Sequence, residues 1–172
     1  MNARTLCSRI LVIVGGIAML VGAIDPLEGS VLILPGSALV ALGAFLGHVE
    51  RPVIVCRVWV FILIAIGVGA MWGLTAVGGF GGATGRSNWW GVLILPYLIG
   101  WSVGIWGPGS PRWMLWSGMA VSLWYLTLAV KIQMHPDPQH RNYGVLIALV
   151  AIGLLTMGGC INRLRKRISA RE

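Results

Sequence analysis

Charged residues are scarce in this chain and are missing from long parts of it. Only 10% of the 172 residues are Asp, Glu, Lys or Arg, whereas water-soluble domains have about 25%. Because ~20 apolar residues in a helix cross the ~30 Å hydrocarbon core of a bilayer, long uncharged runs indicate membrane spans. Six stretches contain no charged residue: 10–24, 29–47, 58–85, 87–111, 113–130 and 142–161. Their number and length exclude a water-soluble domain.

The chain also lacks the ionisable groups on which intramembrane chemistry depends. No Asp, Glu, Lys or His lies in the middle of a span, and such residues mark proton relays and ion paths in membrane proteins. Arg57 comes nearest, and we expect its side chain to snorkel to the surface beside Arg51. No serine–histidine pair, aspartate pair or histidine pair is placed at bilayer depth. We therefore predict no catalytic residues, no cofactor and no bound metal.

Cysteine is equally sparse and carries no recognisable motif. The three cysteines are Cys7, Cys56 and Cys160, and no two of them form a Cys-x-x-Cys pair. An odd number without paired spacing argues against a disulfide framework. We expect these residues to pack as small hydrophobes.

The pattern predicts an all-α fold, a polytopic membrane helical bundle of six transmembrane helices with short loops. The chain is long enough for one integral membrane domain over 1–172 and too short for an additional soluble domain. The expected helices lie near 8–25, 30–47, 52–78, 89–107, 113–131 and 143–162, followed by a basic cytoplasmic tail over 163–172.

The distribution of basic residues predicts the orientation of these helices. Of the 13 lysine and arginine residues, only Arg86, Lys131 and Arg141 fall on one side of a six-span arrangement. The positive-inside rule then places both termini in the cytoplasm (N-in/C-in), and we expect a bacterial inner membrane. The net charge of +8 lies at span ends and forms no face for nucleic acid. The basic C-terminal tail is instead expected to attract anionic membrane lipids.

The first span is the shortest and has two interpretations. Arg4 and Arg9 precede an apolar run, and Val21-Gly22-Ala23 would suit a signal-peptide cleavage site. Against cleavage, the turn-forming residues 25–30 lead at once into the next apolar run, as in a tight hairpin between two membrane helices. Both interpretations leave the orientation of the remaining helices unchanged.

Several of the expected spans contain regularly spaced small residues or a proline. Small residues four apart let membrane helices approach closely, either within the chain or in a homo-oligomer. Such pairs are Ala18/Gly22, Gly43/Gly47, Ala65/Gly69/Gly73 and Gly100/Gly104. Pro35 and Pro96 fall inside expected spans and predict kinks there.

Most polar side chains fall in the expected outer loops. The glycine-rich segment 78–87 departs from the phosphate-binding loop pattern, because Phe80 stands at its first glycine position and Arg86 replaces its lysine. A candidate outer polar cluster comprises Asp25, Glu28, Arg86, His135, Asp137, His140 and Arg141. Its histidine spacing matches no recognised zinc site.

Nine tryptophans are many for this length, and most fall near the expected membrane interfaces. Trp72, Trp101 and Trp124 fall deeper, where they either pack between helices or line a small cavity. The candidate cavity residues are Tyr97, Trp101 and Trp124.

Three functional hypotheses follow. The favoured one is a small multi-pass membrane protein acting as an accessory or scaffold component through helix and lipid contacts, with a partner membrane subunit or a second copy. The alternative is a transporter, or its substrate-binding component, for a small, largely uncharged solute. The third is a membrane enzyme with an outward-facing polar site built from the outer cluster.

Overall fold

All regular secondary structure in the described part of the chain is helical. The structure is a computed structural model that describes residues 3–24, 28–78, 92–134 and 143–169. Its helices are α1 (Ala3–Gly22), α2 (Ser30–Leu46), α3 (Arg51–Ala76), α4 (Leu95–Trp106), α5 (Arg112–Gln133) and α6 (Tyr143–Ser169). Four of them, α1, α3, α5 and the Val145–Ser169 part of α6, are long and apolar enough to cross a membrane, whereas α2 and α4 are shorter. The all-α class is confirmed, with helices compatible with a membrane protein.

The observed helix ends follow the turn residues closely in α2, α3 and α5. Proline stands in the first turn of α3, at Pro52, where a missing backbone donor costs nothing. α3 ends just before Gly78, whose φ of +88° suits glycine at a helix C-terminus. Elsewhere the ends differ from the prediction. α1 begins at Ala3, and α6 continues to Ser169, so residues 163–169 of the predicted basic tail are helical.

α4 is shorter than predicted, and its proline has a different role. Residues 92–94 form a short 3₁₀ turn and the α-helix begins at Leu95. Pro96 therefore lies in the first turn of α4, where its fixed φ favours helix initiation. The predicted kink at Pro96 is wrong for this reason. Pro35 does lie inside α2, as expected.

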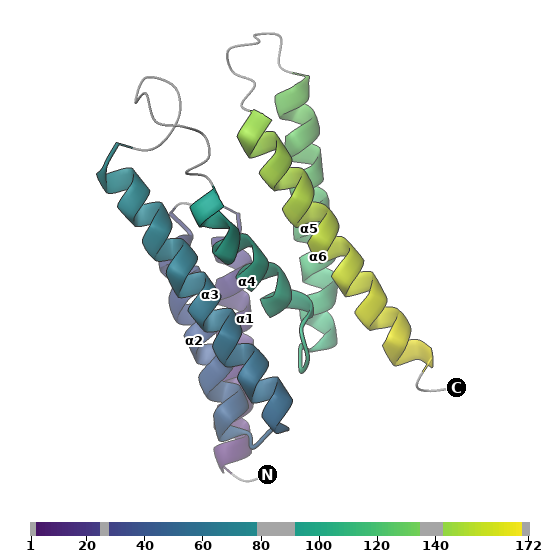
Figure 1. The fold of residues 1–172 in the computed structure, drawn as a ribbon. Helices are drawn as coiled ribbons and strands as arrows, with labels where there is room; N and C mark the ends of the chain where they lie inside the picture. Colours follow the sequence, from purple (N-terminus) through teal and green to yellow (C-terminus); the bar gives the residue numbers. More distant parts are fainter. Residues whose placement is uncertain (1–2, 25–27, 79–91, 135–142, 170–172) are drawn as a thin grey trace.

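Successive helices run in alternating directions, and α1 and α6 bring the two ends of the described chain toward the same end of the bundle (Figure 1). α1 packs mainly against α2, and α5 packs mainly against α6. α4 lies between these pairs and contacts α3, α5 and α6. This shortest helix is therefore the central element of the bundle.

The interior of the bundle is filled by large side chains around α4. Trp101 is 1% exposed and packs in one cluster with Ile64, Ile105 and Met114, which are fully buried. Many apolar side chains on the outside of the helices are half exposed or more, for example Ile66, at 55%. In water, an exposed apolar surface of this size would cause the protein to aggregate or bind other proteins. A surface of this size is compatible with a lipid environment.

Glycines bring several helices into direct backbone contact. A Cβ added to Gly15 in α1 would lie 2.5 Å from the carbonyl oxygen of Gly36 in α2, too close for any larger residue without a shift. Gly100 likewise packs on Leu63 and Ile64 of α3. The predicted close-packing role is thus confirmed at Gly100, but Gly69 and Gly73 have nothing within 4 Å and face outward.

Candidate functional site

A buried arginine near the N-terminal end of α3 is the most unusual polar feature of the bundle. Arg57 is only 3% exposed. Its guanidinium donates one hydrogen bond to the carbonyl oxygen of Gly104 (2.6 Å) and another to the hydroxyl of Ser110 (2.7 Å). The expectation that Arg57 snorkels to the surface beside Arg51 is wrong, because these two acceptors hold it inside the protein.

The end of α4 explains why an arginine is stable there. The last carbonyls of a helix have no intrahelical donor and carry partial negative charge, so a cation is favourable near them. Gly104 lies two residues before the end of α4 at Trp106. Arg57 therefore supplies both a hydrogen-bond donor and a compensating charge to this helix end.

The loop that follows α4 forms a tight turn that presents Ser110 to two arginines. Pro108 and Gly109 occupy its centre, the φ of Gly109 is +78°, and the amide of Ser110 donates to the carbonyl of Gly107 (3.3 Å). A proline followed by a positive-φ glycine is typical of a type II turn. The carbonyl of Ser110 accepts a 2.6 Å hydrogen bond from Arg167 of α6, so α3 and α6 both bind this loop.

Two more donors lie nearby on the contact between α4 and α6. The Nε atom of Arg163 and the indole Nε1 of Trp106 are buried and have no hydrogen-bond partner among the described residues. Trp106 packs on Gly159, where an added Cβ would lie 2.5 Å from the indole nitrogen. Since Gly159 and Arg163 are one helical turn apart, Trp106 packs on the face of α6 that carries Arg163.

Positive charge accumulates around the loop without a described counter-charge. Arg57 and Arg163 repel each other electrostatically. Arg167 is repelled in turn by Arg163 and Arg112. The hydrogen-bond acceptors of Arg57 and Arg167, within the ranges that the structure describes, are neutral hydroxyl and carbonyl oxygens. We call Arg57, Arg112, Arg163 and Arg167 the arginine cluster.

The three candidate cavity residues do not share one environment. Tyr97 and Trp101 are 3% and 1% exposed and belong to the central core. Trp124 is 51% exposed on α5 and lies outside that core. The indole of Trp101 donates a 3.0 Å hydrogen bond to the carbonyl of Met19 and meets Tyr125 edge-on, with ring centroids 6.0 Å apart.

These aromatic donors serve the C-terminal end of α1. The amide of Ala23 bonds to Leu20, one residue short of the α-helical pattern, which leaves the Met19 carbonyl to Trp101. The hydroxyl of Tyr125 donates to the carbonyl of Ala23. Both bonds satisfy helix-end carbonyls that have no helical partner. In the described structure Trp101 therefore joins α4 to α1.

Most of the outer polar cluster falls outside the described residues. Only Glu28 of that set is described, at the turn before α2. The other members, Asp25, Arg86, His135, Asp137, His140 and Arg141, lie outside the described ranges. Within those ranges no three His, Cys, Asp or Glu residues are grouped so as to hold a metal ion.

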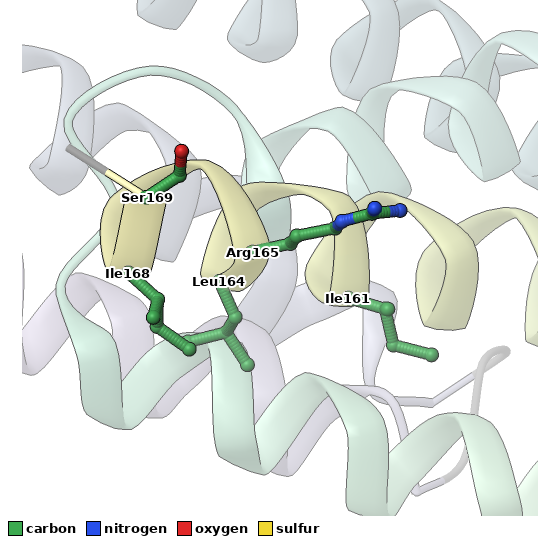
Figure 2. A pocket seen from close by; sticks show the side chains of 5 residues that line it. All are labelled: Ile161, Leu164, Arg165, Ile168 and Ser169. Carbon is green, nitrogen blue, oxygen red and sulfur yellow. The ribbon is translucent and has the colours of Figure 1, made fainter. Parts of the chain in front are cut away.

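A surface hollow lies on the C-terminal part of α6. It is lined by Ile161, Leu164, Arg165, Ile168 and Ser169. Figure 2 shows the three apolar side chains pointing to one side of the helix, with Arg165 extended along it. Ile161 and Ile168 are 49% and 60% exposed, so the hollow is an open apolar surface.

From the sequence, Arg57 is expected to be an interfacial arginine, and neither its burial nor its partners are predicted. The available signal is its position two turns into an apolar helix, where a charged residue is by default a candidate site. The Gly107-Pro108-Gly109 sequence marks a turn. Neither pattern indicates that Arg57 and Ser110 meet, because 53 residues separate them.

Comparison with known protein families, curated proteins and solved structures finds no match to this chain.

Proposed function

We propose that this chain is a six-span membrane protein that acts as an accessory or scaffold subunit through helix and lipid contacts. In this proposal both termini face the cytoplasm of a bacterial cell and the helices lie in its inner membrane. The alternating helix directions and the basic residues near the chain ends support that orientation. The partner is another membrane subunit or a second copy of the chain.

The observation that carries the proposal is the outward surface of the long helices. In each of the four spans, between 22% and 33% of the apolar window is buried inside the bundle. Most of each span therefore faces lipid or another protein. Such a surface supports association, whereas the centre of the bundle around Trp101 is filled by side chains.

The face of α3 that includes Gly69 and Gly73 gives the proposal a specific contact. Both glycines are exposed, and a Cβ there would meet nothing within 4 Å. Small residues four apart are typical of close helix pairs in membranes. A helix of a partner subunit or of a second copy would fit against this face.

The proposal is tested by native mass spectrometry of the full chain, purified in a gentle detergent from its own membrane. We expect a complex containing a partner subunit or a second copy. Gly69→Leu combined with Gly73→Leu should release that partner without lowering the melting temperature. Gly158→Leu is a matched control, because Gly158 also has nothing within 4 Å but lies on α6. A lone chain in both wild type and control contradicts the proposal.

A second candidate is a transporter component for a small, largely uncharged solute. The short central helix α4 favours it, because interrupted helices often form transporter sites at the ends of their half-helices. This candidate requires a retained solute that raises the melting temperature and that Trp101→Ala no longer binds. If purified protein retains no small molecule and Trp101→Ala leaves uptake unchanged, the candidate fails.

A further inference from the structure

The arginine cluster has more hydrogen-bond donors and more positive charge than its protein partners balance. Arg57 and Arg167 bond to neutral oxygens of Gly104 and Ser110. Arg163 brings a third guanidinium, whose Nε is buried without an acceptor in the described structure. A partly buried group of like charges is unfavourable unless an anion compensates it.

The donors define what such an anion must look like. A buried donor without an acceptor is unfavourable, and the indole N–H of Trp106, which packs on Gly159 of the same helix, is a second such donor. Guanidinium groups and an indole N–H are all hydrogen-bond donors. A ligand that matches them therefore carries several anionic oxygens and has no donor of its own that needs an acceptor. A phosphate group has this chemistry and binds arginine in a bidentate manner.

The surroundings of the cluster favour a phosphate carried by a lipid. At ~100° per residue, Arg163 and Arg167 share one face of α6, and the face of Ile161, Leu164 and Ile168 lies about 110° around the same turns of the helix. Together with Arg165 and Ser169, these apolar residues line the open hollow of Figure 2. An acyl chain lying in this hollow would keep its headgroup at the level of the arginines.

We propose that the arginine cluster binds the phosphate of an anionic phospholipid, with Arg163 and Arg167 as its main ligands and an acyl chain along the hollow on α6. The proposal rests on the membrane location put forward above and specifies its lipid contact. Arg57 holds the α4–α5 loop in place, so that the Ser110 carbonyl fixes Arg167. Free inorganic phosphate offers the same chemistry and is separated from lipid by the experiment.

The test measures binding of phosphatidylglycerol to the purified chain at constant ionic strength, by native mass spectrometry and by the shift in melting temperature. Phosphatidylcholine and inorganic phosphate are the comparison probes. We expect phosphatidylglycerol to be retained and to stabilise the protein. Arg163→Gln or Arg167→Gln should weaken its binding about tenfold, the loss typical of one charge-assisted hydrogen bond. Arg163→Lys keeps the charge and serves as the variant least disruptive to folding.

Lys166→Gln is the matched control, because it removes the same charge from the same part of α6 at an exposed position outside the hollow. We expect this variant to retain phosphatidylglycerol. Equal weakening in Arg163→Gln, Arg167→Gln and Lys166→Gln would indicate a diffuse basic surface and overturn the proposal. If inorganic phosphate alone raises the melting temperature as much as phosphatidylglycerol does, the bound phosphate is not that of a lipid and the proposal is overturned. Loss of lipid binding with a copurifying partner still present would overturn this inference and leave the proposed accessory function intact.

Discussion

Arg57 in α3 donates a 2.7 Å hydrogen bond to the hydroxyl of Ser110, 53 residues later in the chain. The same guanidinium caps the end of α4 through Gly104. α3, α4 and the loop before α5 are thereby fixed at one point. Because Arg57 is 3% exposed, this point lies inside the protein and its loss should affect the whole bundle.

Replacing Arg57 by methionine should destabilise the protein. The change removes both hydrogen bonds of Arg57. The Ser110 hydroxyl loses its donor and the Gly104 carbonyl keeps only the long 3.5 Å bond from that hydroxyl, at a cost of about 2–4 kcal/mol. Arg51→Met is the control, because Arg51 is an exposed arginine at the start of the same helix. Tryptophan fluorescence during heating in detergent measures both. A similar melting temperature for the two variants would contradict a structural role for Arg57.

Replacing Trp101 by phenylalanine should cost about 1–3 kcal/mol. The ring remains but the donor to the Met19 carbonyl is lost, which leaves a buried acceptor unpaired. Trp116→Phe is the matched control, since Trp116 is 61% exposed. Chemical or thermal unfolding in the same detergent compares them. If Trp116→Phe proves the more damaging change, Trp101 does not join α1 to α4 as described.

Trp101 and Tyr125 should also be coupled energetically. Their rings meet edge-on at 63°, and aromatic pairs of this kind contribute about 0.5–1.5 kcal/mol beyond their burial. A double-mutant cycle with Trp101→Leu and Tyr125→Leu measures this coupling from unfolding free energies. Strict additivity of the two single changes would show that the rings do not interact.

Glycine-to-alanine changes should lower the melting temperature at glycines packed between helices and leave it unchanged or raise it at glycines that face outward. At Gly100 a Cβ would lie 2.9 Å from the Leu63 Cβ, so Gly100→Ala should force α3 and α4 apart and lower the melting temperature. At Gly69 the added methyl group meets nothing within 4 Å, and alanine raises helix propensity by about 1 kcal/mol. Gly69→Ala should therefore be neutral or stabilising in the isolated chain. A loss of stability at Gly69 equal to that at Gly100 would contradict the packing of α3.

The fold could be predicted largely from local patterns, because apolar length and turn residues act locally. The runs around α2, α3 and α5 are bounded by charged or turn-forming residues, and their ends were predicted within two residues. α4 was less predictable. Proline inside an apolar run is compatible with either a kink or a helix start, and only the position of the preceding turn decides between them.

The candidate site was beyond local prediction for a physical reason. Gly69 and Gly100 belong to similar small-residue patterns, yet one faces outward and the other packs against α3. Arg57 resembles an interfacial arginine until the loop at Ser110 is placed beside it. Whether a side chain is buried depends on which helices become neighbours, and helix periodicity alone does not encode that choice.

Flotation of membranes after alkaline carbonate treatment tests the central claim of a bilayer-embedded bundle most directly. The treatment strips peripheral proteins, and the sucrose gradient separates lipid-bound protein from aggregates. We predict that the full chain floats with the lipid fraction. Release of the folded chain into the soluble fraction would contradict the account.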